Sequence, residues 1–268
     1  MLAADLAALR AGLRVGMPVT KAQALVPGLI VQDADPRADA EGLERLALWA
    51  LQRISPMVAA DPPDGLVIDT TGADHLHGGE AAMLTGMVQR FAASGVEARA
   101  AIADSWGAAH ACARFSRPLT LIIPPGESET ALRDLPIAAL RLDPGLVVSL
   151  RTLGFERIGE LTSQPRAPLA LRFGPEIGRR LDQAMAITAE PIDPVRAPDL
   201  VEVRRAFPEP IGAAETIARY VGKLVVALCD ELEARGLGAK RLDLLFQRVD
   251  TTRMAVRVGT ALPVRDVR

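Results

Sequence analysis

The chain has 268 residues, of which 49% are hydrophobic and only 3% aromatic, and its formal net charge is −2. This length favours two or more domains whose cores are built mainly from aliphatic side chains. No apolar run reaches the ~18 residues of a membrane span, and Met1–Asp5 lacks the basic start of a signal peptide, so we expect no membrane association. Cys112 and Cys229 lie far apart in helical patterns, which predicts reduced cytosolic thiols without a disulfide.

The distribution of charge says more than its sum. Residues 1–132 carry 10 basic and 15 acidic side chains, whereas residues 201–268 carry 12 basic and 9 acidic ones. Any electrostatic contact with phosphates is therefore expected toward the C-terminus. The same asymmetry is also typical of an ordinary solvated domain.

Four elements are predicted in the first 53 residues. Helical periodicity predicts helices at residues 2–11 and Thr20–Val26, each ended by glycine or proline. The short apolar run Leu29–Gln32 is a strand candidate. A longer amphipathic helix is predicted from about Asp39 to Arg53, with apolar positions at Leu43, Leu46, Ala47, Ala50, Leu51 and Ile54.

The stretch Ile54–Gly72 predicts a buried hairpin. One arm ends at Ala60, the turn covers Asp61-Pro62-Pro63-Asp64-Gly65, and the return strand begins at Leu66. Proline presets φ and glycine tolerates positive φ, so this cluster favours a tight turn. Asp61, Asp64 and Asp69 lie on or beside it, in an arrangement that can hold Mg²⁺ against a phosphate.

Helices and strands then alternate. The pattern predicts a helix around Leu84–Phe91, a strand at Val96–Ala103, a helix at Ser105–Phe115 and a strand at Leu119–Ile123. Such alternation indicates one sheet with helices packed on one face. Trp49 and Trp106 are expected to be core or interface anchors.

Histidines His75 and His77 flank Leu76 next to Asp74, and imidazole with carboxylate can bind zinc. No further ligand cluster accompanies them. The pattern therefore favours a solvent-facing turn, and His110 is expected on a helix face.

The second half begins with helical segments. They are predicted at Ala131–Leu142, Leu146–Leu153 and Ile158–Thr162, with Asp143-Pro144-Gly145 joining the first two. A proline-rich linker is predicted at Ala189–Asp199. Beyond it we expect a strand at Val201–Phe207, a long helix around Ile217–Leu232, and a hairpin of Arg241–Arg248 with Arg253–Gly259.

Several motifs together resemble one family. They are Ser55-Pro56-Met57-Val58, the acidic turn with Asp69-Thr70-Thr71-Gly72, Gly12–Met17 with Ala22–Pro27, and His75–Glu80. Their order and spacing resemble the Y-family (UmuC/DinB-type) DNA polymerases over essentially the whole chain, and most of all the family's noncatalytic, ImuB-like accessory branch of bacterial mutasomes.

The resemblance implies a multidomain α+β fold. The expected parts are fingers at 1–35, a ferredoxin-like palm at 36–117, a helix-hairpin-helix-like thumb at 118–192 and a partial β-α-β-β little finger at 198–268. It also implies that the family's first palm strand and the last helix and strand of its little finger lie outside these residues, so that the chain is truncated at both ends.

The same resemblance implies that catalysis is lost. The family's metal-binding Asp-Glu pair falls on Asp64 and Gly65, which we interpret as vestigial. Leu6 and Leu9 stand where the family has a tyrosine and an arginine for the triphosphate, and Trp106 and His110 stand where it has lysines. We therefore expect no catalytic residue, no metal site and no cofactor. In the alternative, Asp61 or Asp74 replaces the glutamate and Mg²⁺ supports an active error-prone polymerase.

DNA contacts are expected in two places. On the predicted C-terminal strands, Arg204, Arg241, Arg253 and Arg257 alternate with apolar residues, and arginines on one face of a sheet can follow phosphates. In the predicted thumb, Gly145 opens a helix whose N–H groups can meet a phosphate. Val147 replaces the family's second glycine there, so a hairpin that only packs is an open alternative.

The segment Arg241–Phe246 also resembles peptides that dock on bacterial sliding clamps. Its alternation makes burial of Leu242, Leu244 and Phe246 in a sheet the simpler interpretation.

The family resemblance implies a noncatalytic scaffold in damage-induced translesion synthesis and mutagenesis, within DNA repair and the SOS response. Its implied partners are primer–template DNA, the sliding clamp, an ImuA-type protein and an error-prone C-family polymerase, in the cytoplasm at the nucleoid. Two alternatives stay open: an active polymerase, and a protein-interaction module without DNA affinity.

Overall fold

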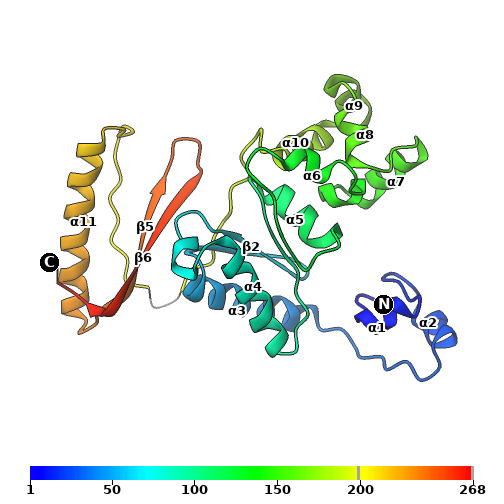
Figure 1. Cartoon of the computed structure of the whole chain (residues 1–268), viewed down its shortest axis with the longest axis horizontal. Helices are drawn as coiled ribbons and strands as arrows, with labels where there is room; N and C mark the ends of the chain where they lie inside the picture. The colour runs from blue at the N-terminus through cyan, green and yellow to red at the C-terminus, as the bar shows by residue number, and fades with distance from the viewer. Residues whose placement is uncertain (198–199, 267–268) are drawn as a thin grey trace.

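The computed structural model describes residues 1–197 and 200–266. Helical and mixed α/β parts follow one another along an elongated chain, with α11 at one end and α1 and α2 at the other (Figure 1). Within the described residues, no helix combines the length and apolarity needed to cross a bilayer.

The N-terminal segment is small and held by local contacts. Helix α1 spans Leu6–Arg10 and begins where Asp5 accepts a hydrogen bond from the Ala8 N–H at 2.7 Å. Helix α2 spans Val19–Leu25. The predicted strand at Leu29–Gln32 is wrong, because these residues have no ladder partner among the described residues.

Helix α3 spans Pro36–Arg53 and confirms the predicted amphipathic helix. It begins three residues early because Asp35 caps it and Pro36 occupies its first turn, where a missing N–H costs nothing. Its Ala47 and Ala50 are fully buried. Small side chains at these positions let the helix approach the hairpin that follows.

That hairpin confirms the prediction for Ile54–Gly72. Strand β1, Met57–Asp61, pairs antiparallel with β2, Gly65–Asp69, so that Asp61 faces Gly65 across the turn. Val58 is fully buried against α3, and the hydroxyl of Ser55 donates to the Asp69 carbonyl. A 3-10 turn, η1 at Asp74–His77, leads into helix α4, Glu80–Ala93.

A parallel strand pair completes this part of the chain. Strand β3, Ala100–Ile102, and strand β4, Thr120–Ile122, are connected through α5, Trp106–Phe115, whose N-cap is Ser105. The expected single sheet is wrong for the described strands, since β1–β2 and β3–β4 form separate sheets. Residues of both β2 and β3 line one groove of about 900 Å³.

The next part is helical and contains the largest core. It consists of α6 Ser128–Leu132, η2 Ile137–Leu140, α7 Pro144–Thr152, α8 Ile158–Thr162, α9 Arg166–Phe173 and α10 Pro175–Ala184. The continuous helix predicted at Ala131–Leu142 is wrong, because Pro136 separates α6 from η2. Fully buried Leu150, Ile158 and Leu181 join these helices to α5 in one cluster.

The C-terminal part follows a linker. Residues 189–197 form no helix or strand, as predicted, and the linker's Pro198 and Asp199 lie outside the described residues. The strand predicted at Val201–Phe207 is wrong, since no ladder includes it. Phe207 instead packs edge-on against Tyr220 of α11, Ala214–Ala234, with ring centroids 4.7 Å apart.

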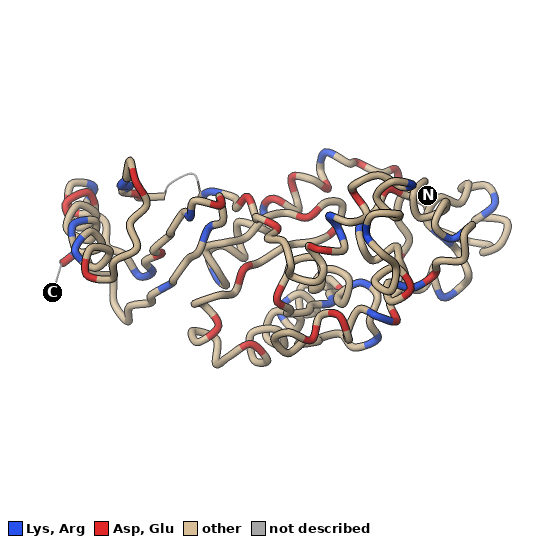
Figure 2. The backbone as a smooth tube through the Cα atoms, turned by 90° about the horizontal axis from the view of Figure 1, so that it is seen from above, with Lys and Arg blue, Asp and Glu red and all other residues tan. Residues whose placement is uncertain are grey.

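The predicted C-terminal hairpin is confirmed and longer than expected. Strand β5, Ala239–Gln247, pairs antiparallel with β6, Arg253–Val264, with Leu242 opposite Val258. Basic and acidic positions are interspersed along this end of the backbone rather than gathered in one block (Figure 2).

Candidate functional site

The carboxylates of the β1–β2 turn are held by two basic side chains of helix α5. The His110 Nδ1 lies 2.9 Å from the Asp61 carboxylate, and the Arg114 guanidinium donates to Asp64 at 2.6 Å. His110 and Arg114 are four residues apart and share one helix face, which α5 turns toward the hairpin. The acidic turn is therefore neutralised from within the protein.

Asp61 is the more deeply placed of the two acids. Its side chain is 16% exposed, and that of His110 is 13% exposed. Burial alone would raise the pKa of Asp61, but the hydrogen bond from His110 and the charges of His110, Arg141 and Arg114 outweigh it and lower the pKa below its ordinary 3.8. The ionised form of Asp61 is thus stabilised by neighbouring side chains.

Gly65 leaves little space for a side chain. A Cβ at this position would lie 3.0 Å from the Arg114 guanidinium, the end of a flexible side chain, and 3.1 Å from the backbone carbonyl oxygen of Asp61. The contact with the backbone therefore limits this position more than Arg114 does. The predicted vestigial pair Asp64 and Gly65 therefore lies in a closed ion pair and a tight turn.

A second ion-pair network lies beside the first. Arg141 stacks over the Trp106 ring, 4.5 Å from its centroid, and donates to Glu190 at 2.5 Å. Arg180 of α10 reaches the same carboxylate at 3.0 Å. Glu190 is only 7% exposed, so two arginines compensate its burial. This network joins α5, the end of η2, α10 and the linker.

The residues present do not fit a two-metal site. Such a site needs carboxylates shared by two divalent ions roughly 4 Å apart. Here Asp61 is hydrogen-bonded to His110, Asp64 pairs with Arg114, and Asp69 accepts the Thr71 N–H at 2.9 Å. Among the described residues, no three His, Cys, Asp or Glu side chains are grouped to hold a metal. Asp74, in η1, lines the same groove as Asp61 and Asp69.

For the zinc alternative at His75 and His77, the fold groups no third His, Cys, Asp or Glu side chain with them among the described residues. His77 Nε2 lies 3.3 Å from the Ile54 carbonyl, which ties η1 to the end of α3.

The expected fingers position Leu9 is 45% exposed on α1, while the side chain of Leu6 lies outside the described part.

The N–H group of Gly145, predicted to contact a phosphate, already has a partner within the protein. The Gly145 N–H donates to the Asp143 carboxylate at 2.8 Å. That acid caps α7, and a second negative group would be repelled there. In this arrangement the hairpin uses its N–H groups for capping.

The predicted arginines are not on one open sheet face. Arg204 is exposed on a segment without ladder, Arg241 donates to the Gln52 carbonyl, and Arg253 lies 3.6 Å from Asp193. Through these contacts the C-terminal hairpin meets α3 and the linker.

Arg257 departs furthest from the expected pattern. Its side chain is 3% exposed and pairs with Asp243 through two hydrogen bonds of 2.7 and 2.8 Å. Val256 and Val258, expected inside, are 43% and 52% exposed. The alternation was predicted correctly, but the inner and outer faces of β6 are exchanged.

The clamp-like segment Arg241–Phe246 lies within β5. Its Leu242, Leu244 and Phe246 are half-buried on one face of the hairpin. This geometry matches the simpler interpretation of a sheet strand.

Sequence reasoning missed three residues that shape the site. Arg114, Arg141 and Glu190 come from α5, η2 and the linker, and no local motif marks them. The spacing of His110 and Arg114 along one helix face was the only available signal.

Comparisons with known proteins agree with this fold. The model of the impB/mucB/samB family matches residues 2–114. The chain is 48% identical over 255 residues to Protein ImuB of Caulobacter vibrioides (strain NA1000 / CB15N), covering 95% of this chain and 55% of that protein. It is 29% identical over 197 residues to DNA polymerase IV of Dehalococcoides mccartyi (strain CBDB1), covering 71% of this chain and 50% of that protein.

Solved structures share the architecture at low identity. A ternary complex of Dbh matches with a TM-score of 0.58 and 16% identity over 99% of this chain and 79% of that one. DinB from Sulfolobus solfataricus matches with a TM-score of 0.55 and 18% identity over 96% and 75%. The chain spans about half the length of the curated relatives it matches. Together with the geometry above, these similarities show that the chain belongs to the Y-family (UmuC/DinB) superfamily of DNA polymerases, with the mixed α+β fold of that family and with ImuB among its relatives.

Proposed function

We propose that this protein is a noncatalytic Y-family homologue that holds DNA and partner proteins during damage-induced translesion synthesis. The observation that carries the proposal is the pairing of Asp61 with His110 and of Asp64 with Arg114. Nucleotidyl transfer requires carboxylates that are free to hold metal ions, and neither Asp64 nor its possible substitute Asp61 is free here. The similarity to ImuB and to DNA polymerase IV supports a place in DNA repair, the SOS response and mutagenesis.

DNA is the first proposed partner. Arg204, Arg241 and Arg253 are kept as candidate phosphate contacts, because all three guanidinium groups lie at the surface or in weak ion pairs. We assign no direct phosphate contact to Arg257, which pairs with Asp243, or to the Gly145 N–H, which donates to Asp143. An ImuA-type protein, the sliding clamp and an error-prone C-family polymerase are proposed as further partners on family similarity.

Primer extension tests the noncatalytic assignment. The full-length gene product is incubated with primed DNA, the four nucleotides and Mg²⁺ or Mn²⁺, beside an active DNA polymerase IV as positive control. We expect no incorporation. Metal-dependent extension that disappears in Asp64→Ala would establish the alternative, an active error-prone polymerase.

Salt dependence tests the DNA contact separately. Log affinity for primed duplex should fall linearly with log salt, with a slope of roughly −0.9 per neutralised phosphate. Arg204→Ala should make the slope shallower by about one contact, whereas Arg37→Ala, an exposed arginine paired with Glu41 on α3, is the matched control. An unmeasurable affinity at low salt would favour the pure protein-interaction module.

A further inference from the structure

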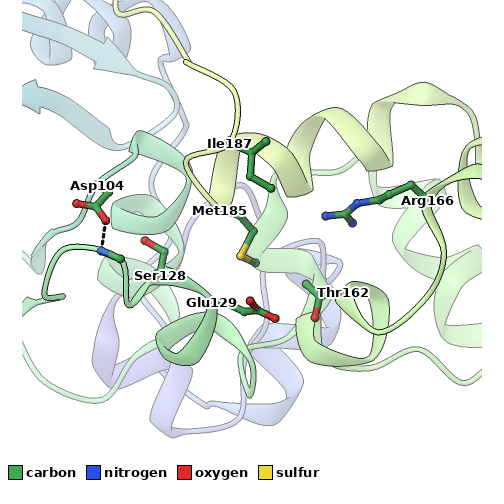
Figure 3. Close-up of a pocket in the computed structure, with 8 residues that line it drawn as sticks. Asp104, Ser128, Glu129, Thr162, Arg166, Met185 and Ile187 are labelled. Carbon is green, nitrogen blue, oxygen red and sulfur yellow. Dashed lines mark hydrogen bonds between the residues drawn. The ribbon is translucent and has the colours of Figure 1, made fainter.

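A second cavity lies away from the turn carboxylates, where the helical part meets the loop after β3. It has a volume of about 340 Å³ and is formed by the Asp104 loop, the start of α6, the end of α8, the start of α9 and the segment after α10. Figure 3 shows the Arg166 guanidinium pointing into it from one side, Ser128 and Asp104 on the opposite side, and the Met185 thioether between them. This volume is at the lower end of those that bind small organic ligands.

Two buried polar atoms around this pocket have no partner within the protein. The hydroxyl of Ser128, a residue 4% exposed, makes no hydrogen bond. Nη1 of Arg166 is equally buried and unpaired, although Nη2 of the same guanidinium lies 3.3 Å from Asp182. Buried donors are nearly always satisfied in folded proteins, by protein, water or ligand, so these two donors beside one cavity can be satisfied by a molecule bound in it that supplies acceptors.

The remaining polar groups of the pocket are already engaged or lie at its rim. Asp104 accepts the Gly126 N–H at 2.6 Å, and the Thr162 hydroxyl donates to the Gly159 carbonyl at 3.1 Å. Glu129 is exposed, and its carboxylate reaches the mouth of the pocket (Figure 3). The pocket therefore offers one free guanidinium donor, one free hydroxyl and one free carboxylate acceptor.

These charges decide the class of ligand. Asp104 and Glu129 outnumber Arg166, so a phosphate or carboxylate inside the pocket would be repelled, and the phosphate of a bound nucleotide has to lie outside it in solvent. A neutral group with an acceptor edge for Arg166 and a donor edge for Glu129 meets no such penalty. A planar ring would also gain from contact with the polarisable Met185 sulfur.

We infer that this pocket binds a guanine base. Guanine presents acceptors at N7 and O6, the pair that arginine recognises in nucleic acids, while its N1–H and N2–H groups are donors on the other side of the ring. Arg166 Nη1 would donate to the first edge, the Glu129 carboxylate would accept from the second, and the Ser128 hydroxyl would bond the ring or its sugar. The source is a free guanine nucleotide or an unpaired guanine of a single strand. This inference is independent of the proposed scaffold function.

Binding of GMP to the full-length protein, followed by ligand-observed NMR and calorimetry, tests the inference. AMP should not compete, and 7-deaza-GMP should bind about five- to tenfold more weakly because it lacks the N7 acceptor. A dT oligomer with one central guanine, compared with the same oligomer carrying 7-deazaguanine, distinguishes a nucleic-acid source from a free nucleotide.

Two variants separate binding from folding. Ser128→Ala removes an unpartnered hydroxyl, so it should leave thermal stability unchanged or raised while weakening guanine binding about fivefold. Glu129→Gln, at an exposed site, should reduce the preference for GMP over IMP. Ser149→Ala on α7, whose hydroxyl donates to the Gly145 carbonyl, is the matched control and should change neither property. Absence of binding to both GMP and the guanine oligomer, or binding that Ser128→Ala and Glu129→Gln leave unchanged, would overturn the inference.

Discussion

Replacing His110 with alanine removes the group that holds Asp61. The two side chains are 13% and 16% exposed and lie 2.9 Å apart, so water can replace the lost partner only in part. A net contribution of about 1.5–3 kcal/mol is typical for a hydrogen bond to a charged group. Arg141 and Arg114 still act on Asp61 in the variant. We therefore expect a loss of about 2 kcal/mol in the free energy of unfolding at neutral pH.

The pH dependence has a definite sign. The pKa of Asp61 is lowered in the folded protein, so its contribution to stability is complete above the ordinary value of 3.8 and is lost as the pH falls through the lower folded pKa. In His110→Ala, burial is no longer offset by the hydrogen bond, and the pKa of Asp61 rises. The stability difference between the parent protein and the variant should therefore shrink as the pH is lowered through this range.

A double-mutant cycle isolates the pair. Urea unfolding followed by circular dichroism gives the free energy of unfolding for the parent, His110→Ala, Asp61→Asn and the double variant at pH 7. We expect a coupling energy of about 1–2 kcal/mol between the two sites. Effects that add within about 0.5 kcal/mol would refute the reasoning that this contact holds the turn.

Four further outcomes test neighbouring contacts. Arg114→Ala should cost less than about 1 kcal/mol in urea unfolding, because Asp64 is 66% exposed, and a larger loss would mean that the pair is structural. Gly65→Glu should lower the melting temperature through the 3.1 Å approach of its Cβ to the Asp61 backbone carbonyl, without creating Mg²⁺-dependent primer extension, and extension by this variant would contradict the conclusion that these residues do not fit a two-metal site. Glu190→Gln should destabilise by about 3 kcal/mol in the same unfolding assay, since it leaves buried charge on Arg141 and Arg180 without its anion, and a cost near zero would count against the network. Gly107→Ala should cost about 1–3 kcal/mol, since its Cβ would lie 3.0 Å from Ala184, and an unchanged melting temperature would show that α5 and α10 can separate there.

Elements with strong local signals were predicted well. Helical periodicity predicted α3, α5 and α11, and turn residues predicted both hairpins. Predictions failed where tertiary contacts decide. The strand at 201–207 has the right alternation, yet Phe207 packs against Tyr220 instead of joining a ladder. Helices α9 and α10 went unpredicted although Pro175 sits in the first turn of α10 and Leu181 is fully buried.

The positions of the turn residues were predicted, but the side chains that contact them were not. The sequence places Asp64 and Gly65 at the turn because the turn chemistry is local. It does not reveal that Arg114 fills the space beside Gly65, since that contact joins residues some 50 positions apart. The exchange of faces on β6 has the same origin. Alternation predicts that Arg257 and Val258 point in opposite directions, but which of them is inside depends on tertiary contacts, the pair with Asp243 and the approach of β6 to Gly72.

In the proposed noncatalytic protein, charge balance links the absence of catalysis to the internal contacts of the turn. A polymerase turn keeps its carboxylates unpaired until metal ions arrive, which costs stability in the free protein. Here α5 places a histidine and an arginine beside these carboxylates, and Arg141, stacked on Trp106, adds a further positive charge near Asp61. Each change alone would leave a buried group without a partner, so the basic side chains and the absent acid form a consistent set. In the proposed scaffold, the same positions help to fix the turn, α5, the helical part and the linker to one another.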